Sequence, residues 1–267
     1  MNKVLIQLLA IIVLFFGTWF VLSQVNWIKV LNVKQHTKRT EEKLGDLFWE
    51  MIKKTEKETS SRFAINAVKQ IRNRICESNN IDSNKIKIHI IVKDDINAFA
   101  LPNNHLVIFT GLIEACENEA ELSGIIGHEI AHMEKNHLMK RLINEAGLSV
   151  LISMTTGNGN PELIKSMVKL LSTSAYDRNL ETEADLTAVE YMINAGIDPE
   201  PMANFLFRLS TETNNLPSQF YWISTHPESE ERAKAILETL KDRIISKKAV
   251  LSKDDWEQLK SKAKEKF

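Results

Sequence analysis

The chain of 267 residues contains only two cysteines, Cys76 and Cys116, and it has no C-x-x-C pair. A cysteine zinc site or a disulfide framework needs more cysteines at characteristic spacings, so both are excluded. Either a single bridge joins the two thiols, or both remain free as small buried side chains.

An excess of positive charge is also missing. The 34 lysines and arginines are balanced by 35 aspartates and glutamates. A nucleic-acid-binding domain usually carries a basic surplus, so the composition predicts no nucleic acid among the partners. Internal repeats are absent from the sequence, and the length is sufficient for one well-buried core.

Charged residues are missing from Val4 to Leu22, where Gln7 is the only strongly polar residue. As a helix with a rise of about 1.5 Å per residue, this run is about 28 Å long, close to the hydrocarbon thickness of about 30 Å. A cleaved signal peptide has a shorter apolar run and an A-x-A-like site, which residues 23–27 do not offer. We therefore predict an uncleaved transmembrane helix and assign residues 1–27 to a membrane anchor.

Alternation of polar and apolar residues predicts a small sheet. Residues 85–90 alternate strictly, and residues 97–101 and 106–110 are two further short apolar runs. The segment 102–105 between these runs contains two asparagines, which tolerate positive φ, and therefore predicts a hairpin turn. We expect a small antiparallel sheet, with His105 as a solvated turn residue.

Helical periodicity dominates the rest of the chain. We predict a helical stalk over residues 28–60, the main domain over 61–246 and a helical tail over 247–267. The remaining helices are expected at about 62–78, 118–137, 142–154, 161–173, 178–195, 200–213 and 228–245, and around Trp256. One block of strands among many helices is typical of the α+β class, so we predict a mostly helical α+β fold.

The helix expected at 118–137 contains the pattern H-E-x-x-H, from His128 to His132. Residues four apart share one face of a helix, so both imidazoles can bind one cation. A catalytic zinc takes three protein ligands and keeps an open position for water, which Glu129 can reach as a general base. The alternative is a solvated helix face. Apolar neighbours such as Ile130 indicate instead a buried helix, whose polar groups need partners.

A third ligand is expected from the acidic stretch at residues 178–185. Glu181 and Asp185 are four residues apart on one predicted helix. Glu181 can bind zinc, and Asp185 can then hydrogen-bond the far nitrogen of a ligand histidine. From spacing alone, an ordinary acidic helix face is an equally good interpretation.

The H-E-x-x-H pattern is followed about fifty residues later by R-x-x-E-x-x-A-D. Together these motifs resemble the family of the CAAX prenyl protease and the heat-shock protease HtpX. The segment 97–102 is similar to a strand of that family, and Thr225-His226-Pro227 followed by Arg232 is similar to a later motif. The resemblance covers about residues 60–240.

The resemblance implies a zincin-type zinc metallopeptidase domain that hydrolyses peptide bonds, with Zn²⁺ as its cofactor. The implied metal ligands are His128, His132 and Glu181. Glu129 is implied as the general base, and Asp185 as the hydrogen-bond partner of a ligand histidine. An edge strand, either 97–101 or 106–110, would bind polypeptide substrates by strand addition. The substrate-binding residues that we infer in the first of these are Asn97, Ala98 and Phe99.

Two departures narrow the resemblance. Some family members have several membrane spans around the site, whereas this sequence predicts only the N-terminal one. It is therefore more similar to the single-anchor BepA-like branch, although the repeat domain of that branch is absent from this sequence. The family often has Arg-His shortly after the motif, where this chain has Asn136-His137; we interpret His137 as structural and off the zinc face.

In the BepA-like branch, the histidine that corresponds to His226 approaches the zinc. We expect His226 to be a regulatory residue or fourth ligand, or else a histidine at the start of a helix without metal contact.

These features predict a single-pass membrane protein whose peptidase domain lies in the periplasm or on another extracytoplasmic side. The lysines and arginines near the apolar run favour the opposite side, but such a count decides little for a long domain. The expected function is a membrane-anchored zinc metalloendopeptidase that cleaves unfolded or envelope proteins in protein quality control. The alternative, from another class, is a zinc-bearing chaperone or assembly factor with latched proteolysis.

Overall fold

The computed structural model describes residues 33–158, 160–212, 222, 225–227, 229–241, 243, 245 and 247–264. Glu42–Phe267 form one compact unit. Among the described residues, no helix combines the length and the apolar character that a membrane crossing requires. The predicted anchor over residues 1–27 lies outside the described part of the chain, and the boundaries proposed for the stalk, main domain and tail stay predictions.

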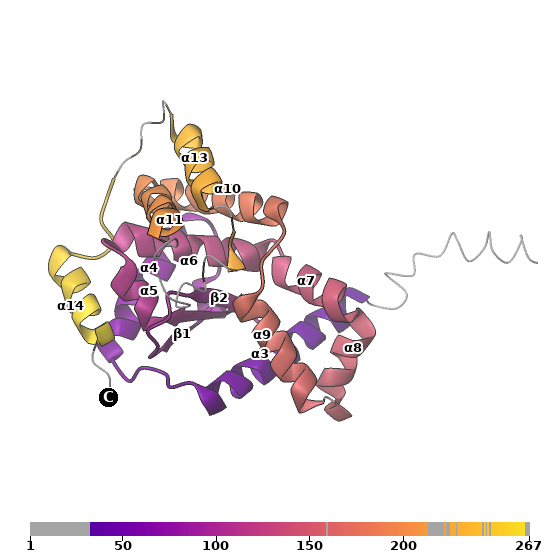
Figure 1. Cartoon of the computed structure of the whole chain (residues 1–267). Coiled ribbons are helices and arrows are strands. Elements are labelled where there is room, and N and C mark those ends of the chain that lie inside the picture. The colour runs from indigo at the N-terminus through magenta and orange to yellow at the C-terminus, as the bar shows by residue number, and fades with distance from the viewer. Residues whose placement is uncertain are drawn as a thin grey trace, which may run out of the picture. The chain divides into compact units, whose positions relative to one another are not determined.

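Many helices and one small sheet build the fold, which confirms the α+β class (Figure 1). The helix that carries the H-E-x-x-H motif is α6 (Glu119–Glu134). The helices before it are α3 (Val33–Thr55), α4 (Arg62–Ser78), the short 3₁₀ helix η1 (Ser83–Lys85) and α5 (Thr110–Ala115). The helices after it are α7 (His137–Ala146), α8 (Leu148–Ser153), the π-helical turn η2 (Met154–Asn158), α9 (Pro161–Thr173), α10 (Arg178–Ala195), α11 (Glu200–Glu212), α13 (Ser229–Leu240) and α14 (Lys253–Lys264).

Helix ends follow local sequence signals. Ser61 caps α4 and Asn118 caps α6, because each side chain accepts a backbone N–H of the first turn. One helix prediction was wrong. The helix expected at 142–154 is divided between α7 and α8, since Gly147 between them adopts a positive φ of 78°. Glycine reaches that conformation without steric cost and interrupts the helix.

The sheet contains β1 (Lys87–Ile91), β2 (Ala98–Leu101) and β3 (His105–Phe109), in the order β1-β3-β2. The predicted hairpin joins β2 and β3 in antiparallel pairing, and the turn residues Asn103 and Asn104 have φ values of 61° and 55°. The prediction of an antiparallel sheet was wrong for β1, which pairs with β3 in parallel. Because β3 pairs with both other strands, it lies in the middle of this sheet and β2 lies at an edge.

His105 is a further correction, because it is buried rather than solvated, with an exposed fraction of 3%. The hairpin turn is so short that His105 is already the first residue of β3. Its ring stacks on His89 of β1, with centroids 5.1 Å apart, and His89 stacks on Trp49 of α3 at 3.5 Å. The Nε2 atom of His105 lies 3.2 Å from the Asp46 carboxylate of α3. The helix thus covers this end of the strand.

The motif helix α6 lies in the interior and contacts α4, α10, α11 and β2 (Figure 1). Of two glycines on its packed faces, Gly124 is needed for this close packing and Gly127 is not. A Cβ atom on Gly124 would lie 2.6 Å from the Cβ of Met202 in α11, which is closer than side chains approach. A Cβ atom on Gly127 would lie 3.6 Å from Ala188 of α10, an ordinary contact. The expected burial of this helix is confirmed.

Both cysteines are buried, and neither takes part in a disulfide. Of the two alternatives for these thiols, the structure contains the free pair. Burial raises the pKa of Cys76 to about 12 and raises the pKa of Cys116 well above its usual range. Both thiols therefore stay protonated at neutral pH, and such buried thiols are poor nucleophiles.

Candidate metal centre

Four side chains from three segments converge in the interior of the unit. Potential ligand atoms of His128, His132, Glu181 and His226 all lie within 4.8 Å of one another. The Nε2 atoms of His128 and His132 are 2.9 Å apart, and Glu181 Oε1 lies 3.2 Å from His132 Nε2. All four side chains are buried. Imidazole nitrogens and a carboxylate oxygen are donors that zinc accepts in catalytic sites, so this donor set fits the metal.

Helix α10 contributes two carboxylates that lie one turn apart. Glu181 faces the histidines, and Asp185 Oδ1 lies 2.9 Å from His128 Nδ1, the ring nitrogen on the far side from the cluster. Arg232 of α13 donates to both oxygens of Asp185, from Nε at 2.6 Å and from Nη2 at 2.7 Å. Its Nη1 lies 2.8 Å from Glu181 Oε2. One guanidinium therefore holds both carboxylates in position.

Neighbouring positive charges keep both carboxylates ionised despite their burial. Burial opposes ionisation of Asp185, but the charge and hydrogen bonds of Arg232 outweigh it and lower the pKa of Asp185 to about 2. Burial likewise acts to raise the pKa of Glu181. The fixed positive charge of Arg232, with contributions from the neighbouring histidines, nevertheless holds this pKa well below the usual range. Both groups are therefore carboxylates at neutral pH, the form that binds a cation.

Glu129 occupies the same turn of α6 as the two histidines. Its Oε2 accepts the backbone N–H of Ala100 at 3.0 Å. Its Oε1 is buried without a hydrogen-bond partner among the described residues and lies 3.4 Å from His226 Nε2. Burial raises the pKa of Glu129 to about 7. A carboxyl group that titrates near neutrality can both accept and return a proton, as a general base must.

The three residues predicted to bind substrate lie at the start of the edge strand. Ala98 and Phe99 belong to β2 and Asn97 comes directly before it, and all three are buried. The Asn97 amide donates to the backbone carbonyl of Ser172 in α9 at 3.1 Å. Of the two candidate edge segments, only 97–101 forms an edge, because β3 lies between the other two strands.

His226 lies inside the cluster rather than apart from it. Its Nδ1 is 3.0 Å from both oxygens of Glu181 and 3.2 Å from His128 Nε2. Its ring stacks on Trp222, with centroids 4.6 Å apart. Burial lowers the pKa of His226 to about 4, so the ring is neutral at pH 7 and offers a lone pair. The structure therefore gives this histidine the position of a potential fourth ligand.

Two aromatic residues at the site were not predicted. Tyr176, which precedes α10, stacks on His132 with ring centroids 4.3 Å apart, and the Arg141 guanidinium lies 4.4 Å from the Tyr176 centroid. Trp222 donates its backbone N–H to the carbonyl of Ile96 at 3.0 Å and so joins the His226 segment to the start of β2. Neither residue belongs to a recognisable ligand pattern, so the sequence offered no signal for their contacts.

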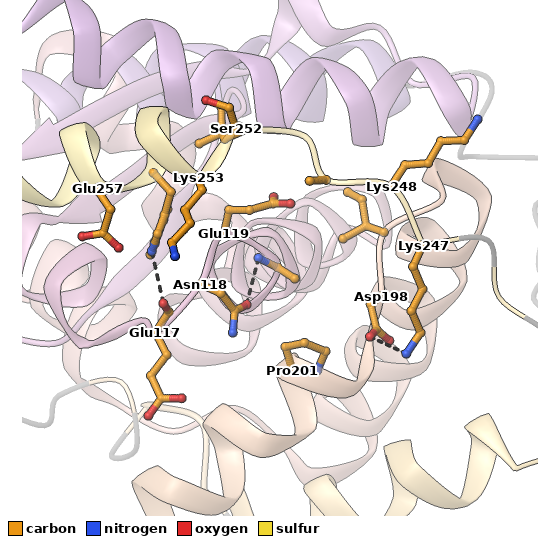
Figure 2. Close-up of a pocket in the computed structure, with 15 residues that line it drawn as sticks. Glu117, Asn118, Glu119, Asp198, Pro201, Lys247, Lys248, Ser252, Lys253 and Glu257 are labelled. Carbon is orange, nitrogen blue, oxygen red and sulfur yellow. Dashed lines mark hydrogen bonds and ion pairs between the residues drawn. The ribbon is translucent and has the colours of Figure 1, made fainter.

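A cavity of about 480 Å³ lies around the N-terminus of α6, at the opposite end from the motif (Figure 2). Asn118, Pro201, Lys247 and Trp256 are among its lining residues. The Trp256 indole donates to the backbone carbonyl of Glu117 at 3.1 Å, which fastens the C-terminal segment there. No residue of the metal cluster lines this cavity. It is therefore distinct from the centre where the histidines meet.

Comparison with known proteins adds independent findings. A sequence model described as Peptidase family M48 matches residues 65–240. The chain is 29% identical over 172 residues to "Metalloendopeptidase OMA1, mitochondrial" of Bos taurus, and this match covers 59% of this chain and 32% of the relative. It is 26% identical over 179 residues to "Beta-barrel assembly-enhancing protease" of Yersinia pestis, with 62% and 36% covered. It is 28% identical over 180 residues to "Metalloprotease YcaL" of Escherichia coli (strain K12), with 64% and 66% covered. The matched part spans from about a third to about two thirds of these relatives.

Proposed function

The chain belongs to peptidase family M48, whose match covers more than half of its 267 residues, and on this premise we propose that it is a zinc-dependent endopeptidase. The observation that carries the proposal is the buried group of four metal donors with Glu129 beside it. The metalloprotease names of the relatives support the same reaction class. Polypeptides are the substrates in this proposal.

Each residue of the centre has a distinct task. His128, His132 and Glu181 hold the zinc ion, as their donor types and short mutual distances support. Zinc bound there would polarise the scissile carbonyl and make a water molecule more acidic. Glu129 takes the proton of the attacking water at its free Oε1 and returns it to the leaving amine nitrogen. Asp185 keeps the His128 ring oriented with Nε2 towards the metal.

The edge strand β2 aligns the substrate backbone. In antiparallel pairs, residues alternate between those bonded to the partner strand and those whose polar groups face outward. Asn97 O accepts the Phe109 N–H of β3 at 3.0 Å, so Ala98 and Ala100 are the residues whose polar groups face the free edge. The Ala100 N–H already donates a hydrogen bond to Glu129 Oε2 and is not available to a substrate. We assign the carbonyl of Ala100 and both backbone groups of Ala98 to an added substrate strand.

His226 closes the resting centre in this proposal, because its Nδ1 occupies the cluster and the surrounding side chains are buried. A closed state favoured by about 2.7 kcal/mol would leave about one molecule in a hundred open. His226→Ala should then raise basal proteolysis at unchanged zinc content. Lower turnover at the same zinc content would instead make His226 a proton or hydrogen-bond donor in the reaction.

The closed centre also supports the second candidate, a zinc-bearing chaperone or assembly factor whose proteolysis is latched and secondary. For either function, residues 1–27 supply the membrane anchor and the domain lies on the extracytoplasmic side, where it acts on unfolded or envelope proteins. A topology reporter fused after residue 267 tests the side. Reporter activity in the cytoplasm would contradict this placement.

Glu129→Gln in the full chain tests the proposed chemistry. The variant keeps the shape of the side chain and removes the base, so it should retain zinc and lose at least about a hundredfold in hydrolysis of a casein-like unfolded substrate. Glu134→Gln, an exposed position on the same helix, is the matched control and should keep wild-type activity. Wild-type cleavage by Glu129→Gln would contradict the assigned mechanism.

A further inference from the structure

The two histidines of the motif are oriented by different kinds of neighbour. His128 Nδ1 faces the Asp185 carboxylate. His132 Nδ1 lies instead 2.9 Å from Nδ1 of His137, the first residue of α7. His137 Nε2 in turn lies 3.3 Å from Glu183 Oε2 of α10. The side chains of His132 and His137 are fully buried.

We propose that His137 and Glu183 form a hydrogen-bond relay that positions His132 for the metal. The inference rests on the proposed metal site. His132 Nε2 faces the cluster, so its proton must be on Nδ1 when Nε2 gives a lone pair to a cation. The Nδ1–H of His132 then donates to Nδ1 of His137. This leaves the proton of His137 on Nε2, from which it donates to the Glu183 carboxylate, so each contact joins one donor to one acceptor.

A left-handed residue brings His137 to the His132 ring. On an uninterrupted α-helix, a residue five positions later lies about 140° further around the axis and cannot reach that ring. Here α6 ends at Glu134, and Asn136 adopts φ 57° and ψ 30° before α7 begins. Asparagine tolerates this conformation better than most residues do. The chain therefore turns back at the position where His137 meets the far nitrogen of His132.

Glu183 is held at the other end of the relay by Lys135. The Lys135 ammonium lies 3.3 Å from Glu183 Oε1, and the Glu183 side chain is 45% exposed. Glu183, two residues after Glu181, therefore joins α10 to the junction between α6 and α7. The relay thus links the helix of the two histidine ligands to the helix of the carboxylate ligand.

A positioning role has a signature that a purely structural role lacks. Loss of the outer hydrogen-bond partner of a metal-bound histidine typically weakens metal affinity by about 10–100-fold. A residue that only fills the core would instead lower the stability of the fold and leave the zinc affinity of the folded protein unchanged. The two effects are separated by measuring affinity and apoprotein stability on the same variants.

The test compares His137→Leu and His137→Asn in the full chain. Zinc affinity is measured by competition with a chromogenic chelator, and apoprotein stability by thermal unfolding. His137→Leu should bind zinc about 10–100-fold more weakly. His137→Asn should recover most of that loss, because its Oδ1 lies near the former Nδ1 and can accept the His132 proton. Leu138→Ala, at the next buried position of α7, should lower stability without changing zinc affinity.

Substitutions of Glu183 provide a second test, because this side chain is 45% exposed and its replacement does not disturb the packed core. Glu183→Ala should weaken zinc binding, and Glu183→Gln should restore it, since its amide oxygen still accepts from His137. Wild-type affinity in both His137→Leu and Glu183→Ala would overturn the relay while the metal site stands. Failure of the wild-type chain to bind zinc would overturn the proposed function together with the relay.

Discussion

Acidification from pH 7 to pH 5 should lower the stability of the native protein by about 2 kcal/mol through one buried residue outside the metal centre, His105. Its ring is only 3% exposed, and burial lowers its pKa from 6.5 to about 4. The Lys87 ammonium, 3.2 Å from Nε2, contributes in the same direction. Asp46 opposes the shift without cancelling it.

The sign follows from proton binding in the two states. The unfolded chain takes up a proton as the pH falls through about 6.5, whereas the native state resists until about 4. Between these values the unfolded state binds more protons, so the free energy of unfolding decreases as the pH is lowered. The expression RT ln[(1 + 10^(6.5−pH))/(1 + 10^(4−pH))] gives a loss of about 0.2 kcal/mol at pH 7 and about 2 kcal/mol at pH 5, with a ceiling of about 3 kcal/mol.

Urea unfolding of the metal-free protein at both pH values provides the assay, with His105→Gln as the comparison. His89, whose pKa burial also lowers, remains in both proteins, so the comparison reports the loss of His105 together with its contact to His89. The stability advantage of the wild type over His105→Gln should shrink by about 2 kcal/mol between pH 7 and pH 5. An advantage that is the same at both pH values would refute the assigned burial of this ring.

Two further predictions concern packing and charge around α6. Gly124→Ala should destabilise the fold by about 1–3 kcal/mol because of overpacking, whereas Gly127→Ala should be neutral or stabilise it by up to about 1 kcal/mol in thermal unfolding. Equal effects of the two substitutions would contradict the packing described. Arg232→Met should destabilise the metal-free protein by about 3–5 kcal/mol at neutral pH, because Asp185 is left buried without its partner. A loss as small as that of Lys234→Met, an exposed position of the same helix, would contradict the pairing.

Features that depend on neighbours along the chain were predictable. The starts of α9 and α10 agree with the prediction, because Asn160 and Asp177 provide local N-terminal caps. The spacing of the H-E-x-x-H motif places His128 and His132 on one face of α6 whatever packs against it. The structure brings Glu181 to that face, where the sequence alone left an acidic helix surface as an equal alternative.

Features that depend on distant segments were not predictable. Alternation in residues 85–90 indicates a strand but not its partner, so the parallel pairing of β1 was missed. The burial of His105 depends on α3, which lies far away in the sequence. The contact between His137 and His132 requires the left-handed conformation of Asn136, which breaks the helical spacing from which side-chain directions are inferred.

Zinc stoichiometry of the full chain tests the central claim most directly. The wild type should bind about one zinc ion, as expected for a three-ligand catalytic site, and a chelator should abolish hydrolysis of an unfolded substrate until zinc is restored. The double variant His128→Ala/His132→Ala should lose the metal, while His105→Gln should keep it as a control for a buried histidine elsewhere. A double variant that still carries one zinc ion per chain would contradict the assignment of the metal centre.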